Sequence, residues 1–278
     1  MSALTPFALG LRSTGGSPDA VRSAVGGRLA VVTGASSGIG REVSRRLVSV
    51  GATVVGVART AGALDELSDW SMGRFHPLAG DLRDLAWAGE AASQIVAQYG
   101  APALLVSNAG HSIHRMLGEY TSRFHDIQRT AGVNYLGAVA FSLPLLAAMM
   151  QRGSGHLVYV STTSVDAQAP GWSAYTASKG AYELWLRGVA PELWVAGVKT
   201  TSIHLPRVRS AMSAPTAGRY PLPELGIGQA ADIICSAIVE KPRFVIPWWA
   251  KATAVIQAGG PTAFQRLWEL ALRAGVKP

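Results

Sequence analysis

Short apolar segments alternate with longer helix-like segments along most of this chain. The apolar segments have the length and the Val, Ala and Leu content of strands that are buried on both faces. Strands that alternate with helices predict a parallel sheet with helical crossovers, so the predicted fold class is α/β, with one doubly wound parallel sheet of about seven strands covered on both faces. The predicted strands cover 29–33, 52–58, 75–81, 103–107, 156–161, 199–205 and 243–247. The predicted helices cover 39–50, 61–69, 84–99, 120–150, 173–195 and 229–240.

The composition favours a globular chain with a sizeable core. Its 278 residues are 49% hydrophobic and 15% charged, and this charged fraction is too low for a disordered chain or a coiled coil. A single Cys excludes an intramolecular disulfide and a cysteine metal cluster. Residues 1–28 are rich in Gly, Ser, Ala and Pro, so we expect a mobile extension there and one domain over 29–278.

The first residues lack the basic segment and continuous apolar segment that are typical of a signal peptide. We therefore expect a reducing, cytoplasmic setting. The uncharged apolar segment 134–151 is shorter than the roughly 20 apolar residues that a membrane-spanning helix needs. We expect this run to form a buried helix.

A glycine-rich segment, TGASSGIG at 33–40, lies between the first predicted strand and the first predicted helix. Glycines allow a tight turn and a close approach of the main chain to phosphate, and a helix that begins there points its positive end at the ligand. This context predicts a Rossmann-type site for the pyrophosphate of a dinucleotide. The residues expected to hold it are Gly34, Ser36, Ser37, Gly38, Ile39 and Gly40.

The end of the second predicted strand indicates which dinucleotide binds. An NAD site usually has an acidic residue there for the ribose 2′-hydroxyl, whereas an NADP site uses an arginine for the 2′-phosphate. This chain has no acid at that point and instead has Arg59 followed by Thr60. A guanidinium and a hydroxyl can both donate hydrogen bonds to a phosphate, so we predict NADP(H) as the cofactor.

Tyr175 and Lys179 lie four residues apart at the start of a predicted helix, and this spacing puts both side chains on one face. A phenol exchanges protons poorly at neutral pH, but a nearby ammonium favours the phenolate and lowers the pKa of the phenol. The hydroxyl of Thr162 lies thirteen residues before the tyrosine, at the end of a predicted strand. This combination indicates general acid–base chemistry.

Over about residues 29–240 the chain resembles the short-chain dehydrogenase/reductase family. The shared motifs follow the family's order and spacing: TGASSGIG at 33–40, Asp81-Leu82, Asn108-Ala109-Gly110, Asn134 in VNYLG, and YTASK at 175–179. The resemblance implies hydride transfer between a nicotinamide and a carbonyl or alcohol carbon. It also implies a homodimer or homotetramer formed through 120–150 and 173–195. The loop 206–216 is similar to that of a bacterial subgroup that resembles fatty-acyl-CoA reductases.

The resemblance also implies catalytic roles. Tyr175 would be the general acid in reduction, and Lys179 would hold the nicotinamide ribose and lower the pKa of the tyrosine. Thr162 would orient and polarise the carbonyl oxygen, and Asn134 would hold a water in the proton relay. The family normally has Ser at the position of Thr162, and threonine adds a methyl group to the hydroxyl. Asp166 lies where the family often has Gly, and it is expected to be either a loop carboxylate or a substrate contact.

Further cofactor contacts are implied by the same motifs. Many members of the family have Pro-Gly after the sixth strand, where this chain has Pro206 followed by Arg207. The residues implied are Asp81 and Leu82 beside the adenine, Asn108, Ala109 and Gly110 beside the central strands, and Pro206 and Val208 at the nicotinamide carboxamide.

The formal net charge of +8 is concentrated at the C-terminal end. Residues 205–278 carry nine basic and four acidic side chains, whereas 29–204 carry thirteen and twelve. The nearly neutral body has no module of clustered Lys, Arg and aromatic residues, so we expect no nucleic-acid partner. Two interpretations of the excess charge stay open. The charge meets either an acidic substrate, through Arg207, Arg209 and Arg219, or anionic lipid in a peripheral membrane contact, through Trp248, Trp249, Lys241, Lys251, Arg266 and Arg273.

The leading interpretation is an NADP(H)-dependent oxidoreductase acting on an apolar, fatty-acyl or lipid-like small molecule, in either direction. A β-ketoacyl- or hydroxysteroid-type reductase is the alternative within the family. An alternative of another class is a catalytically silent regulatory protein that binds the dinucleotide, and only Thr162 favours it. His111 and His114 have no acid or Cys that completes a ligand set, so we expect no metal site.

Overall fold

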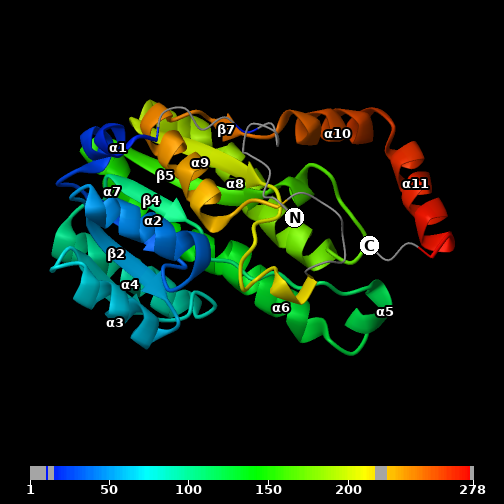
Figure 1. Cartoon of the computed structure of the whole chain (residues 1–278), viewed down its shortest axis with the longest axis horizontal. Coiled ribbons are helices and arrows are strands. Elements are labelled where there is room, and N and C mark those ends of the chain that lie inside the picture. Colours follow the sequence, from blue (N-terminus) through cyan, green and yellow to red (C-terminus); the bar gives the residue numbers. More distant parts are fainter. Residues whose placement is uncertain (1–10, 12–15, 217–223, 276–278) are drawn as a thin grey trace.

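A parallel sheet of seven strands lies at the centre of the computed structural model, which describes residue 11 and residues 16–216 and 224–275 (Figure 1). The strand order is β3-β2-β1-β4-β5-β6-β7, so the chain runs outward from β1 and later returns to β4 at the centre. The strands are β1 (Leu29–Thr33), β2 (Thr53–Ala58), β3 (Phe75–Ala79), β4 (Leu104–Ser107), β5 (Gly155–Thr162), β6 (Val198–Leu205) and β7 (Phe244–Val245). The predicted doubly wound α/β fold is confirmed.

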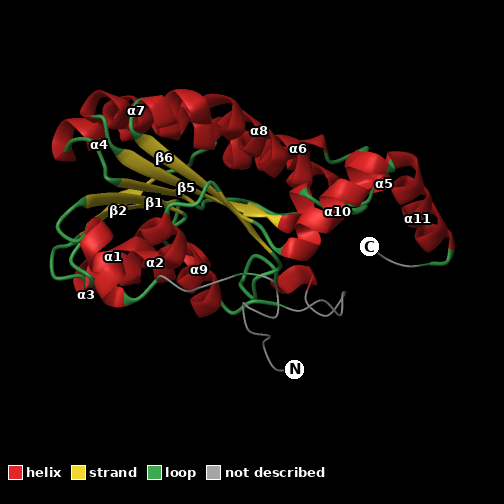
Figure 2. Cartoon of the chain, turned by 90° about the horizontal axis from the view of Figure 1, so that it is seen from above, coloured by secondary structure: helices red, strands yellow, loops and turns green. Residues whose placement is uncertain are grey.

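Helices cover both faces of this sheet (Figure 2). Successive strand residues alternate between two apolar cores: Val32 and Val106 lie in one, and Val31 and Leu105 lie in the other. The first core is closed by α1 (Pro18–Val25), α2 (Gly38–Ser49), α3 (Ala61–Trp70) and α9 (Ile227–Glu240). The second core is closed by α4 (Leu85–Tyr99), α7 (Gly137–Arg152) and α8 (Ser173–Val195). Both faces of the strands are therefore dry, which explains their continuous apolar sequence.

The segment predicted as one helix over 120–150 consists of several elements. These elements are α5 (Leu117–Tyr120), α6 (Phe124–Ala131), the π-helical turn η1 (Gly132–Leu136) and α7. The run Phe124–Arg152 is long and apolar enough to cross a membrane by length and composition alone. Half of its most apolar window is buried in the protein, and α7 packs on α4, β4 and β5, so it serves as a core helix here.

An irregular, mobile extension was expected over residues 1–28, of which 1–10 and 12–15 lie outside the described residues; the structure differs from this expectation over 18–25. Residues Pro18–Val25 form α1, whose N-cap Ser17 accepts a hydrogen bond from the main-chain nitrogen of Ala20. Val21 and Val25 are buried, and α1 packs on α9 and α2. An isolated helix of this length is not stable in water, so it depends on a tertiary contact that the local sequence does not reveal.

Two helices follow the last strand at the carboxyl end of the sheet. They are α10 (Trp248–Gly259) and α11 (Pro261–Arg273), and both extend away from the body of the molecule (Figures 1 and 2). Ala250 on α10 is fully buried, whereas none of the residues of α11 is buried. This C-terminal arm, residues 248–273, therefore presents much of its surface to solvent.

Candidate active site

The predicted site residues gather at the carboxyl edge of the sheet, next to the point where the strand order reverses. The glycine-rich turn follows β1, and the Asn108-Ala109-Gly110 motif follows β4, its neighbour on the other side of the reversal. Ligands of open α/β sheets bind in the crevice at such a switch point.

The glycines of the turn lie where side chains do not fit. Gly34 has φ +72°, and a Cβ on it would lie 2.8 Å from Nδ2 of Asn108. A Cβ on Gly40 would lie 2.2 Å from the carbonyl oxygen of Gly34. Gly38 begins α2 with φ +54°, a conformation that favours glycine. The turn is therefore folded tightly against the end of β4.

The amino end of α2 is free to bind an anion. Its N-cap, Ser37, makes no side-chain capping hydrogen bond, and the first turn contains no acidic residue. The main-chain N–H groups and the positive end of the helix dipole are therefore available to a phosphate. Ser36, which precedes the N-cap, and Ile39, in the first turn, belong to the same segment. The turn and the helix together fit a dinucleotide pyrophosphate.

Asn108 links the two central strands at this edge. Its Nδ2 donates to the carbonyl oxygen of Thr33 at 3.0 Å. The main-chain nitrogens of Asn108 and Ala109 each lie 3.0 Å from Oγ1 of Thr33. These bonds join the end of β4 to the end of β1 and support the floor of the cofactor crevice.

The residues predicted for the adenosine end of the cofactor lie after β2 and β3. Arg59 and Thr60 are exposed at the end of β2. Asp81 is bound by Arg83, whose Nε lies 2.9 Å from Oδ2, and this hydrogen bonding lowers the pKa of Asp81. The side chain of Leu82 is buried in the core, so that any contact with an adenine is left to its main chain.

Lys179 lies in the buried interior of the site. Its Nζ donates to the carbonyl oxygen of Val160 at 2.9 Å and lies 5.1 Å from the ring centre of Tyr159. The hydroxyl of Tyr159 donates to the carbonyl oxygen of Lys179 at 3.0 Å. Burial lowers the pKa of Lys179 to about 8. The positions of Tyr159 and Val160 around this lysine carry no sequence signal of their own, because both read as ordinary strand residues.

Tyr175 lies one turn before Lys179 on α8 and faces the end of β5. Burial raises the pKa of its phenol, and a hydrogen bond with Thr162 opposes this effect. That Lys179 lowers this pKa, as the resemblance implies, stays a prediction. Oγ1 of Thr162 also lies 3.2 Å from Oγ of Ser164. The predicted threonine, tyrosine and lysine are therefore brought together at one place.

Asn134 is fixed by the π-helical turn. Its Oδ1 accepts from the main-chain nitrogen of His111 at 2.7 Å, and its Nδ2 lies 2.9 Å from Oγ of Ser178. π-Turns are common at functional sites because they redirect a side chain. A Cβ on Gly110 would lie 3.1 Å from Oδ1 of Asn134 and 3.3 Å from Nζ of Lys179. A glycine at position 110 thus leaves room for Asn134 and Lys179 on either side.

The last predicted site residues lie in the loop after β6. Pro206 is buried, and Val208 forms an isolated parallel bridge with Leu225. Arg207 is not available to a substrate, contrary to the expectation for this loop. Its Nε lies 2.6 Å from Oε1 of Glu224, and its two terminal nitrogens donate to the carbonyl oxygens of Ser213 and Thr216.

The other two arginines of that interpretation differ from Arg207. Arg209 is exposed, and its Nε lies 4.0 Å from Glu224. Arg219 lies outside the described residues. Of the described arginines in this loop, only Arg209 is therefore still available to an acidic substrate.

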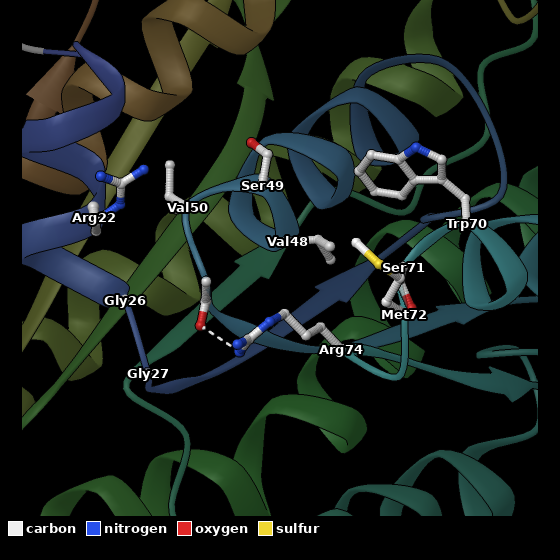
Figure 3. A pocket seen from close by; sticks show the side chains of 11 residues that line it. Arg22, Gly26, Gly27, Val48, Ser49, Val50, Trp70, Ser71, Met72 and Arg74 are labelled. Atoms are coloured by element: carbon white, nitrogen blue, oxygen red, sulfur yellow. Dashed lines mark hydrogen bonds between the residues drawn. The ribbon is translucent and has the colours of Figure 1, made fainter.

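A cavity of about 710 Å³ lies at the opposite edge of the sheet, before β1, β2 and β3 (Figure 3). Its lining includes Arg22, which pairs with Asp19, and Arg74, which donates to the carbonyl oxygen of Gly51. The cations of this cavity already have partners, and none of the predicted site residues lines it. Within the described ranges, no group of three His, Cys, Asp or Glu side chains could hold a metal ion.

Comparisons with known proteins agree with this geometry. A family model described as short chain dehydrogenase matches residues 28–220. The chain belongs to the short-chain dehydrogenase family. A solved short-chain dehydrogenase from Streptomyces avermitilis is 27% identical with a TM-score of 0.74, covering 88% of this chain and 97% of that one.

Two bacterial relatives carry a more specific name. A fatty acyl-CoA reductase of Acinetobacter baylyi is 37% identical over 243 residues, which cover 86% of this chain and 82% of the relative. A fatty acyl-CoA reductase of Mycobacterium tuberculosis is 34% identical over 239 residues, covering 84% and 81%. An uncharacterized oxidoreductase of the same species is 35% identical over 253 residues, covering 89% and 74%.

The family and the geometry define the chemistry of the site. This short-chain dehydrogenase is an oxidoreductase that acts on a CH–OH or C=O group with a nicotinamide dinucleotide, which supplies or accepts the hydride when bound. The raised pKa of Tyr175 keeps its phenol protonated at neutral pH, so this residue can donate a proton to a carbonyl oxygen. Thr162 can donate a hydrogen bond to the same oxygen, and Lys179 brings a buried amine to the crevice.

Proposed function

We propose that this short-chain dehydrogenase uses NADP(H) and reduces, or in reverse forms, the carbonyl group of a fatty-acyl or similar lipid-like substrate. The relatives named fatty acyl-CoA reductase, which align with more than four fifths of the chain, are the observation that carries the proposal. Arg59, exposed at the end of β2, where the sequence has no acidic residue, supports NADP(H).

The surroundings of Tyr175 support an apolar substrate. The ring of Trp172 lies 6.0 Å from the ring of Tyr175, and the ring of His114 lies 5.2 Å from that of Trp172. These rings form an aromatic cluster beside the phenol. Aromatic walls bind an apolar chain while they leave polar recognition to a few groups around the reacting carbonyl.

A substrate screen tests the proposal. Oxidation of NADPH, followed by its absorbance, is expected with long-chain acyl-CoA or fatty aldehyde and not with short polar ketones. Turnover only of β-ketoacyl thioesters or of ketosteroids would replace this proposal by the alternative within the family. Binding of NADPH without oxidation in the presence of any of these carbonyl compounds would indicate the catalytically silent protein.

We also propose a homodimer or homotetramer formed through α7 and α8. Leu136, Leu143 and Met150 are exposed at intervals of seven residues, and Leu184 is exposed on α8. A row of apolar residues with this spacing is typical of a helix that packs on another helix. Replacing Leu143 by Glu is expected to lower the mass measured by light scattering to that of a smaller assembly. An unchanged mass would contradict this interface.

We further propose that the protein is cytoplasmic and that its C-terminal arm binds the surface of an anionic membrane. Trp248, Val255 and Ile256 on α10 are exposed by 68%, 72% and 65%. On α11, Leu267 and Leu270 are exposed, and Arg266 and Arg273 lie on the polar side of the helix. Apolar residues with flanking cations are typical of helices that lie in the membrane interface.

Vesicle sedimentation tests this contact. The protein is expected to sediment with vesicles of phosphatidylglycerol and phosphatidylcholine, and much less with phosphatidylcholine alone. Replacing Val255 and Ile256 by Glu is expected to abolish sedimentation, whereas the control Val195→Glu, which changes an exposed residue at the end of α8, leaves it intact. If the double variant changes only the oligomeric state, the arm binds a second copy of the chain and the proposal is wrong.

A further inference from the structure

A buried histidine lies between two carboxylates directly behind the active site. His204, on β6, is fully buried, and its Nδ1 lies 2.6 Å from Oδ2 of Asp166. Its Nε2 lies 3.4 Å from Oε2 of Glu183. The three residues come from a loop, a strand and a helix that are distant in the sequence. None of them belongs to the family motifs that the chain matches.

Asp166 belongs to the loop that directly follows Thr162, the last residue of β5. It follows the 3₁₀ turn η2 (Thr163–Val165), four residues after Thr162, and its side chain is only 10% exposed. The main-chain nitrogens of Asp166 and Ala167 both donate to the carbonyl oxygen of Thr163 at 3.1 Å. A displacement of the Asp166 carboxylate therefore also displaces the turn next to Thr162.

Glu183 belongs to the catalytic helix. It lies one turn after Lys179 on α8, and its side chain is 4% exposed. It accepts a hydrogen bond from Oγ of Ser202, and Nε of Arg187 lies 2.9 Å from its Oε1. Tyr175, Lys179, Glu183 and Arg187 follow one another at intervals of four residues, so they share one face of α8.

Asp166, His204, Glu183 and Arg187 form a row of neighbouring ionisable groups whose charges alternate when the histidine carries a proton. Burial by itself lowers the pKa of His204, but its hydrogen bond with Asp166 and its charge interactions with Glu183 and Asp166 outweigh burial and raise that pKa above the ordinary 6.5. Beyond Glu183 the next charged group is Arg187 on α8. Glu183 and Arg187 line a small cavity together with Arg243, which precedes β7. With His204 protonated, His204 and Arg187 are the cations that pair with Asp166 and Glu183. Buried carboxylates require such partners.

We propose that His204 is a positioning residue of the active site: its protonated ring holds Asp166 to Glu183 and thereby fixes the loop of Thr162 against the helix of Tyr175. The reaction that this geometry serves is the one proposed above, so the kinetic part of the test rests on that function. The hydrogen-exchange part measures how the loop is held, and it does not depend on that function. The glycine that the resemblance often places at this position has no side chain for such a bridge.

Hydrogen exchange of the loop tests the bridge without any substrate. Asp166→Asn and His204→Gln are each expected to lower the protection of the amides of residues 164–167 at least about tenfold at pH 7. In the unmodified chain the protection factors of these amides, corrected for intrinsic exchange rates, are expected to be high below pH 6.5. They are expected to fall as the pH rises through the raised pKa of His204, because the deprotonated ring no longer bridges the two carboxylates. In His204→Gln this pH dependence is expected to disappear.

His156→Gln is the matched control. His156 is also buried, on the neighbouring strand β5, and its Nε2 lies 2.8 Å from Oγ1 of Thr201. Burial lowers its pKa to about 3, so it does not change charge between pH 6 and 9. Its replacement is expected to destabilise the fold without changing the protection of residues 164–167.

Kinetics with the substrate that the screen identifies provide the second measurement. His204→Gln and Asp166→Asn are each expected to lower kcat about 10- to 100-fold with an unchanged dissociation constant for NADPH, because small displacements of a reacting group have effects of this size. The double variant is expected to lose no more kcat than the worse single variant.

Unchanged loop protection in both single variants would overturn the bridge. Changed protection with an unaltered kcat would overturn the positioning role. If the screen identifies no substrate, the proposed function fails while the exchange result still decides the bridge. Asp166→Asn, on a loop, provides the test if His204→Gln does not fold.

Discussion

Replacing Tyr175 by Phe is expected to lower kcat at least about 10³-fold and to change the dissociation constant of NADPH less than about twofold. The substitution removes one oxygen atom from a side chain that reaches Thr162 and leaves the ring that packs near Trp172. Because burial raises the pKa of Tyr175, the reduction rate of the unmodified protein should stay level through neutral pH. The rate of the reverse reaction should rise with pH, since it requires the phenolate.

Tyr182→Phe is the matched control for this prediction. Tyr182 lies on the same helix and is fully buried, and its hydroxyl lies 2.9 Å from Oγ of Ser142. Its loss removes a buried hydrogen bond, so the free energy of unfolding should fall by about 1 kcal/mol while kcat stays within about twofold. If Tyr175→Phe retained turnover comparable to this control, general acid catalysis by Tyr175 would be wrong.

Replacing Arg59 by Asp is expected to lower kcat/KM for NADPH about 10²-fold and to leave or improve that for NADH. The exposed guanidinium at the end of β2 would bond the 2′-phosphate, and a charge-assisted hydrogen bond of this kind contributes about 1.5–3 kcal/mol. A carboxylate there repels the phosphate but can accept a hydrogen bond from a 2′-hydroxyl. Initial rates with both dinucleotides measure the change.

The control for charge is Arg273→Asp, the same substitution on α11, which lies at the other end of the molecule from β2 (Figure 1). It should leave both values of kcat/KM unchanged. A protein that preferred NADH before any substitution, or an Arg59→Asp variant that behaved like the control, would remove Arg59 from the cofactor site.

Much of the fold and of the site follows from local pattern. The strand segments are apolar because both faces of the sheet are covered, so their sequence predicts them directly. The glycine turn and the spacing of Tyr175 and Lys179 are short-range constraints, since a helix turn or a tight turn depends on neighbours within four residues. Helix boundaries were less predictable: the segment 120–150 is divided by a π-turn that leaves no mark in the apolar period.

By itself, the sequence determined the parallel sheet, the place of the dinucleotide turn and the pairing of Tyr175 with Lys179, because each depends on residues close together in the chain. Only the tertiary structure decided which partner each charged side chain takes. Arg207 is paired with Glu224 rather than left for a substrate, and Asp166 meets His204, 38 residues further along the chain. A buried charge must be paired by whatever group the fold brings within reach, and parallel strands bring together residues that no local pattern connects.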